Sequence, residues 1–268
     1  MANATPILGI DVSAIQGVVD WPRVASAGVK FAWLKCTEGN EPARNDRKFA
    51  INAQGCKSVG IYVGAYHFCY PLEKGAGNDP VEQARRAYAA SDALGTLPGE
   101  IPPACDIEWP EPTQWQKWNV TAETIAAWTK AYLEEATRLW GKKPIVYTYP
   151  WFWQALGKAD ISWAKEYMLW IAHYRDIEKW VPAETTRPIV PKPWDDWTFW
   201  QFSANRGLRI PGCETDIDRN LFRGDLDGLR RLAGIEPDAP TQPAPLEEDQ
   251  PIVHAMPDML EAWRKRNE

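Results

Sequence analysis

Apolar residues in the first 235 positions fall into short runs, and the segments between several of these runs have helical periodicity. The runs are rich in β-branched and aromatic residues, have the length of a strand, and span residues 7–12, 29–36, 60–68, 102–108, 144–149, 167–174 and 197–203. Strands that are covered on both faces are apolar without alternation, so these runs predict a buried parallel sheet.

The clearest helical pattern spans residues 121–139, where apolar residues recur along one stripe and Thr121 is suited to cap the first turn. Further helices are predicted at 44–56, 81–94 and 225–233, with Gly234 directly after the last one. Repeated alternation of strand and helix over about 230 residues predicts a single α/β domain. The most economical architecture for it is a TIM-type (β/α) barrel.

The character of the chain changes near Gly234. Residues 236–268 combine six prolines with eight acidic and three basic residues, and a short amphipathic segment at 259–266 follows Pro257, the last of these prolines. This composition predicts an extended linker or tail with a short helix, so residues 1–235 are expected to form the catalytic barrel. The tail accounts for most of the net charge of −6 and leaves the body near neutral, which argues against nucleic-acid binding.

Several other classes are disfavoured by what the sequence lacks. No run approaches the roughly 18 apolar residues of a membrane span, and the first residues lack the pattern of a secretory signal. Five cysteines without CxxC spacing predict reduced, buried thiols rather than a disulfide framework. Only three histidines are present, without a His-x-His pair, and no glycine-rich phosphate loop follows a strand. Neither a metal nor another cofactor is therefore expected.

Tryptophan is unusually frequent, with 16 residues. Flat aromatic faces with a polar N–H suit sites that hold sugar rings, although most of these side chains can equally fill the core.

The most informative acidic segment is Ile101-Pro-Pro-Ala-Cys-Asp-Ile-Glu-Trp-Pro110. If residues 102–108 form a strand, Asp106 and Glu108 point to the same face, and the Trp-Pro pair places both at its C-terminal end. Barrel enzymes carry their catalytic groups at that end.

Two further acidic segments accompany this pair. Asp11 lies at the end of the first predicted strand, where a turn or helix-cap role is the alternative. Asp216 and Asp218 are two residues apart near the end of the body, where either can also be an ordinary surface acid. Acids at three strand ends of one barrel predict a shared site.

Eight short motifs resemble, in order, those of the glycoside hydrolase family 25 muramidases, the Chalaropsis-type lysozymes common among phage endolysins. They are Gly9-Ile-Asp-Val-Ser with Gln16-Gly17 and Asp20-Trp21; Phe31 to Lys35-Cys-Thr-Glu-Gly39; Gly64-Ala-Tyr-His-Phe68; Asp106-Ile-Glu108; Pro144-Ile-Val-Tyr-Thr148; Leu169-Trp-Ile-Ala-His-Tyr174; Trp200-Gln-Phe-Ser203; and Pro211-Gly212 leading to Asp218-Arg-Asn220. The resemblance covers residues 9–222 and excludes the tail.

This resemblance implies a somewhat irregular (β/α) barrel that hydrolyses the β-1,4 bond between N-acetylmuramic acid and N-acetylglucosamine in bacterial peptidoglycan. It implies that Glu108 is the general acid and Asp106 its partner, with Asp11 and Asp218 as the other two acids. Asp218 is preferred to Asp216 because it matches the motif in which the acid precedes one residue and then Asn. We expect Glu108 to keep its proton near neutral pH and Asp106 to stay charged.

The glycan is expected to contact residues near the strand ends, namely Tyr66, Tyr147, Trp170, Tyr174, Gln201 and Glu38. Each aromatic residue of this set can instead belong to the core or rim, and Glu38 can form a structural ion pair with Lys35. Retaining and inverting courses both remain open.

Two other functions are compatible with the sequence. One is a glycan-binding protein without catalysis, and the other is a hydrolase of a different N-acetylated glycan. No membrane insertion and no obligate protein partner is expected. The absence of a signal pattern predicts synthesis in a cytoplasm and action on the cell wall after release through a holin or delivery in a virion.

Overall fold

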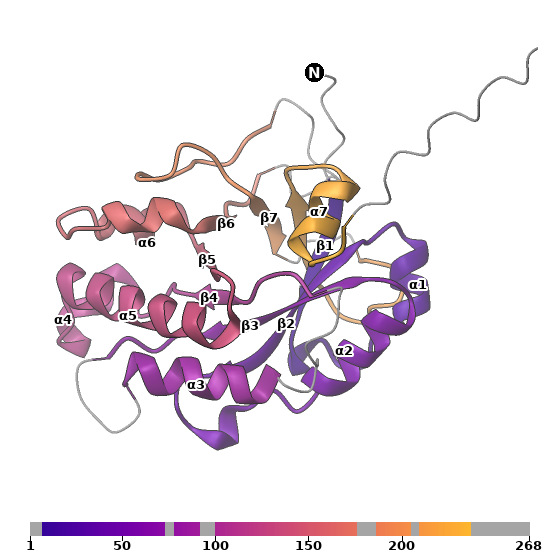
Figure 1. The fold of residues 1–268 in the computed structure, drawn as a ribbon, viewed down its shortest axis with the longest axis horizontal. Coiled ribbons are helices and arrows are strands. Elements are labelled where there is room, and N and C mark those ends of the chain that lie inside the picture. The colour runs from indigo at the N-terminus through magenta and orange to yellow at the C-terminus, as the bar shows by residue number, and fades with distance from the viewer. Residues whose placement is uncertain (1–6, 73–77, 92–99, 176–185, 205–208, 237–268) are drawn as a thin grey trace, which may run out of the picture. The chain divides into compact units, whose positions relative to one another are not determined.

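Eight strands form a closed barrel in the order of the sequence in the computed structural model, which describes residues 7–72, 78–91, 100–175, 186–204 and 209–236. The strands are β1 (Ile7–Val12), β2 (Phe31–Glu38), β3 (Tyr62–Phe68), β4 (Ala104–Asp106), β5 (Ile145–Thr148), β6 (Met168–Ala172), β7 (Phe199–Ala204) and β8 (Asp218–Phe222). The predicted α/β barrel of the TIM type is thereby confirmed (Figure 1).

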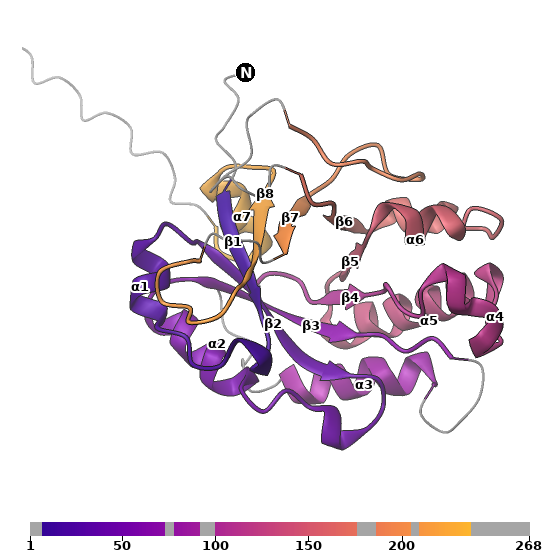
Figure 2. The same cartoon turned by 180° about the vertical axis from the view of Figure 1, so that it is seen from behind.

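The direction of the last strand differs from the prediction of a wholly parallel sheet. Strands β1 to β7 run parallel, whereas β8 pairs antiparallel with both β7 and β1. Figure 2 shows β8 between these two neighbours. Because β8 runs in the opposite direction, its first residue lies at the end of the barrel where the parallel strands finish.

Helices cover the outside of the barrel (Figures 1 and 2). They are α1 (Trp21–Ser26), α2 (Phe49–Ser58), α3 (Pro80–Ser91), α4 (Trp115–Trp118), α5 (Ala122–Trp140), α6 (Pro150–Ala155) and α7 (Leu226–Leu232), with short 3-10 turns η1 (Ala14–Gln16), η2 (Pro42–Arg44), η4 (Pro112–Gln114) and η5 (Ser162–Glu166). The predicted capping of α5 is confirmed, because the Thr121 side chain accepts a hydrogen bond from the Thr124 backbone N–H.

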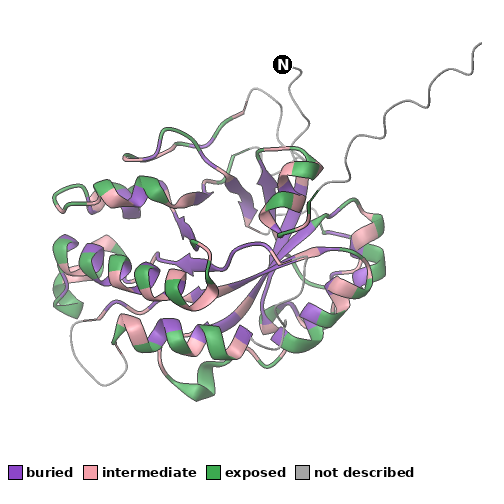
Figure 3. Ribbon diagram, viewed as in Figure 1, coloured by how far each residue is buried: buried purple, intermediate pink, exposed green. Residues whose placement is uncertain are grey.

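Two apolar layers hold the fold together, one between barrel and helices and one inside the barrel. Figure 3 shows the buried strands and the exposed outer faces of the helices. Inside the barrel, Trp33 stacks on Trp170 with ring centroids 4.9 Å apart. Gly64 makes room for this stack, since a Cβ at that position would lie 2.3 Å from the Trp33 ring. Many of the tryptophans therefore serve as core.

Other sequence-based expectations concern thiols, membranes and the tail. All five cysteines are buried and free, as predicted. Within the described ranges, no helix is long and apolar enough to cross a membrane. The predicted tail lies outside the described residues from position 237 onward, so the boundary near 235 stays a prediction.

Candidate active site

Four carboxyl groups line one cleft of about 320 Å³ at the C-terminal end of the parallel strands. Asp11 is the fifth residue of β1, Asp106 is the last residue of β4, and Asp218 is the first residue of β8. Glu108 lies two residues beyond β4, so the predicted strand 102–108 was too long at both ends. Asp106 and Glu108 nevertheless face the same cleft.

The two C-terminal aspartates differ in where they lie. Asp218 lies in register with Asp11 across the β1–β8 pair and lines the cleft. Asp216 is exposed and does not line the cleft.

Asp11 is held by amide donors from the two closing strands. Its Oδ2 accepts hydrogen bonds from Gln201 Nε2 at 2.9 Å and from Asn220 Nδ2 at 2.7 Å. Asp218 also hydrogen bonds to Asp11. Hydrogen bonds to a carboxylate favour its charged form and fix its orientation, so Asp11 is the best-supported anion of the cleft.

Three aromatic residues orient these amides. The hydroxyl groups of Tyr147 and Tyr174 donate to Gln201 Oε1 at 2.9 and 3.0 Å, and Trp170 Nε1 donates to Asn220 Oδ1 at 2.7 Å. With their oxygens occupied in this way, both amides present their N–H groups to the acid. Tyr147, Trp170 and Gln201, predicted as glycan contacts, thus also form part of the support of Asp11.

Burial raises the pKa of every acid in the cleft. The pKa of Glu108 rises to about 7, first through burial and then through the charges of Asp11 and Glu111. The pKa of Asp218 rises to about 9 through burial and its contact with Asp11. Glu108 is therefore half protonated near neutral pH, as a general acid requires.

The expectation that Asp106 stays charged is not supported. Burial, followed by the charge of Glu108, raises its pKa well above the usual range, and Lys35 offsets only part of this. The physical reason is that Asp106 is 5% exposed and its Oδ1 has no hydrogen-bond partner among the described residues. Asp218 Oδ1 is likewise buried and unpartnered there, so neither oxygen has a hydrogen bond that would favour the charged form.

The remaining predicted contacts divide into two groups. Tyr66 lines the cleft beside the acids, and Tyr174 lies at its edge with half of its surface exposed. Glu38 is not brought into the cleft, because it pairs with Lys35 and Arg44 and accepts a hydrogen bond from Tyr70 at 2.7 Å. It lines a neighbouring groove instead.

Sequence reasoning missed one flank of the site. A hollow of about 430 Å³ continues from Glu108 and is lined by Glu111, Tyr149, Trp151, Ala172, His173 and Tyr174. Trp151 is 58% exposed, which is unusual for so large an apolar side chain. Its position directly after β5, in Tyr149-Pro-Trp151, was the signal that could have identified it.

The described part of the chain offers no set of ligands for a metal ion. No group of three or more His, Cys, Asp or Glu side chains there has the arrangement that could hold a metal ion.

A barrel that gathers buried carboxyl groups at its mouth, one of them with a pKa near 7, is the arrangement of a glycoside hydrolase. Residues 10–212 match the family described as glycosyl hydrolases family 25. The chain belongs to this family, which confirms the resemblance seen in its motifs.

Named relatives agree with this assignment. The chain is 31% identical over 238 residues to "Lysozyme M1" of Streptomyces globisporus, covering 87% of this chain and 73% of the relative. It is 26% identical to the "N,O-diacetylmuramidase" of Chalaropsis sp, covering 85% and 99%. The crystal structure of the bacterial lysozyme from Streptomyces coelicolor superposes with a TM-score of 0.70 at 27% identity, covering 86% of this chain and 98% of that one.

Proposed function

We propose that this enzyme is an N-acetylmuramidase that hydrolyses the β-1,4 bond between N-acetylmuramic acid and N-acetylglucosamine in bacterial peptidoglycan. The observation that carries the proposal is the cleft with four carboxyl groups in which the pKa of Glu108 is about 7. The names of the relatives, a lysozyme and a diacetylmuramidase, favour peptidoglycan over other glycans.

In this proposal Glu108 is the general acid. It donates its proton to the oxygen that links the two sugars, and the bond from that oxygen to C1 of the muramic acid breaks. The positive charge that develops on the muramic acid ring is stabilised by the anionic Asp11, which its amide donors hold in place.

Asp106 acts next to Glu108, where its carboxyl group lines the cleft. This carboxyl is placed to form a hydrogen bond with the N-acetyl group of the substrate or with the water that attacks C1. The Trp151 hollow beyond Glu108 lengthens the cleft to hold further sugars of a polymer, with an exposed indole face for stacking.

Product analysis tests the proposal. Purified peptidoglycan is digested with the enzyme, the products are reduced with borohydride, and mass spectrometry identifies the reduced sugar. A muramidase yields reduced N-acetylmuramic acid, whereas reduced N-acetylglucosamine would contradict the assigned bond.

The Glu108→Gln variant tests the general acid. We expect its activity to fall about a thousandfold, because Gln has no proton to donate. Glu134→Gln, on the exposed face of α5, is the matched control and should keep full activity. Wall binding without any clearing by the wild-type enzyme would instead indicate a glycan-binding protein.

A further inference from the structure

We propose that a second groove, continuous with the catalytic cleft, binds the stem peptide of the peptidoglycan substrate. This inference rests on the proposed muramidase function. Muramic acid carries a short peptide on its lactyl group, and that peptide combines carboxylates with small apolar side chains. The groove beside η1 and α2 offers cations and apolar surface in the same combination.

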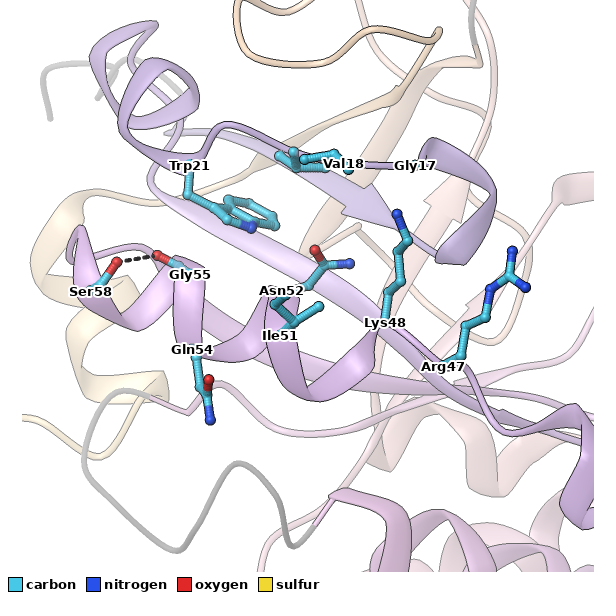
Figure 4. Close-up of a pocket in the computed structure, with 11 residues that line it drawn as sticks. Gly17, Val18, Trp21, Arg47, Lys48, Ile51, Asn52, Gln54, Gly55 and Ser58 are labelled. Atoms are coloured by element: carbon cyan, nitrogen blue, oxygen red, sulfur yellow. Dashed lines mark hydrogen bonds between the residues drawn. The ribbon is translucent and has the colours of Figure 1, made fainter.

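The groove begins at the catalytic cleft itself. Ser13, Ile15 and Lys35 line both the cleft and the adjoining hollow that Arg44 and Arg47 border. Arg47 in turn lines the next hollow, of about 690 Å³, between the segment 17–21 and helix α2. We call this last hollow the α2 groove, and Figure 4 shows the residues that line it. The catalytic cleft, the adjoining hollow and the α2 groove thus follow one another through shared lining residues.

Two cations along this path have side chains that no other described residue pairs with. Arg47 is exposed and Lys48 is partly buried, and among the described residues neither side chain has a hydrogen-bond or ion-pair partner. Figure 4 shows Lys48 extending from the N-terminal end of α2 toward the segment of Gly17, whereas Arg47 lies beyond that end and extends away from the helix. The adjacent cations Lys35 and Arg44 are occupied by Glu38. Arg47 and Lys48 are thus the groups available to a carboxylate, and they offer it charge-assisted hydrogen bonds.

Apolar surface lines the rest of the α2 groove. Val18 and Ile51 contribute opposite walls and are 74% and 65% exposed. Trp21 is buried and forms the floor, where it packs so closely on α2 that a Cβ at Gly55 would lie 2.1 Å from its ring. Small apolar side chains, such as the methyl groups of alanine residues, fit against such surfaces.

The walls of the α2 groove are fixed before any ligand binds. Val19 forms a β-bridge with Cys213, and the Asp20 backbone N–H donates to the Gly212 carbonyl at 2.8 Å. On the other side, the Ala14 backbone N–H donates to Asp46 Oδ2 at 2.6 Å, which ties η1 to the segment before α2. A preformed groove binds a flexible peptide with less loss of entropy than a mobile one.

Charge separates the two parts of the substrate. The anionic Asp11 in the catalytic cleft disfavours the carboxylates of the peptide, whereas the exposed cation of Arg47 favours them. The neutral glycan therefore lies along the acids while the anionic branch is directed toward α2.

The test compares two substrates, intact glycan strands and strands from which an amidase has removed the peptides. For Arg47→Glu we expect KM on the peptide-bearing strands to rise about tenfold, because an attraction to carboxylate becomes a repulsion. Activity on peptide-free strands should stay within about twofold of the wild type, because Arg47 is exposed and its replacement does not disturb the fold. Arg47→Lys should restore most of the loss.

Two further variants complete the test. Ile51→Asp should impair the enzyme on peptide-bearing strands only, because it places an anion in the α2 groove. Arg231→Glu changes the net charge equally on the exposed face of α7 and should affect neither substrate. Equal losses on both substrates with Arg47→Glu, or no loss on either, would overturn the peptide groove. Failure of the wild-type enzyme on both substrates would instead refute the muramidase function, and the groove proposal with it.

Discussion

Asp218 lies directly opposite Asp11 across the antiparallel pair of β1 and β8, and the two side chains share a hydrogen bond. Two carboxyl groups so close together cannot both ionise freely. Asp11 receives two amide donors, so the proton resides on Asp218, whose pKa rises to about 9. The pair therefore carries one negative charge at neutral pH.

Asp218→Asn should stabilise the fold at pH 7 to 8. A carboxyl whose folded pKa lies above its unfolded value binds more protons in the folded state, so stability falls as pH rises from about 4 toward 9. Asn keeps a hydrogen-bond donor toward Asp11 but does not titrate, so the variant avoids this fall in stability with pH. Its Tm should therefore rise by at least about 2 °C at pH 8 and little at pH 4. Calorimetry at both pH values measures this, with the exposed Asp216→Asn as control. An equal shift at both pH values would contradict the shared proton.

Asn220→Asp should have the opposite effect and lower the stability of the fold at high pH. The new carboxyl still accepts from Trp170 but replaces the amide donor that faces Asp11. At pH 8 the repulsion should cost about 1–3 kcal/mol of unfolding free energy, and protonation should remove most of this at pH 4. Urea denaturation at the two pH values measures it. Gln154→Glu, exposed on α6, adds the same charge without this contact, and an equal loss in that variant would contradict the explanation.

Glu111→Gln should shift the alkaline limb of the activity profile to lower pH. Glu108 must be protonated to act, so kcat/KM falls as pH rises through about 7. The charge of Glu111 raises the pKa of Glu108, and Gln removes that charge while still accepting the hydrogen bond from Tyr149. The pH dependence of kcat/KM on a soluble glycan measures the shift. An unmoved limb would show that Glu108 does not control it.

Trp151→Ala should raise KM for polymeric substrate about tenfold and leave kcat nearly unchanged. The side chain lines the hollow beyond Glu108 and is 58% exposed, so the variant loses a stacking surface but little core. Steady-state kinetics on long and short strands measures the effect, which should be absent with the shortest substrates. Trp118→Ala on α4 serves as the control for loss of a partly exposed tryptophan.

Much of the fold could be predicted because its signals are local. Apolar runs identified seven of the eight strands, and Thr121 marked the start of α5. The eighth strand is only five residues long and begins with Asp-Arg-Asn, so it contains no apolar run that could have predicted it. Its antiparallel direction is seen only in its pairing with β7 and with β1, which lies at the other end of the domain sequence, so no local pattern predicts it.

The candidate site was predictable in its acids but not in their environment. The motifs selected Asp11, Asp106, Glu108 and Asp218, and all four line the cleft. The raised pKa of Asp106 depends on burial and an unpartnered oxygen, which only the assembled barrel creates. The support of Asp11 by Asn220 likewise joins residues 209 positions apart.

The antiparallel direction of β8 also determines at which rim of the barrel the first strand begins and the last strand ends. Ile7 pairs with Phe222, so the outer ends of the first and last strands meet on the rim opposite Asp11 and Asp218. In an all-parallel barrel the last strand would instead finish beside the catalytic groups. In the described part of the chain, the start of β1 and the end of β8 thus lie on the rim away from the four acids. An affinity tag or a wall-targeting module joined directly to β1 would therefore begin on the rim away from the catalytic groups.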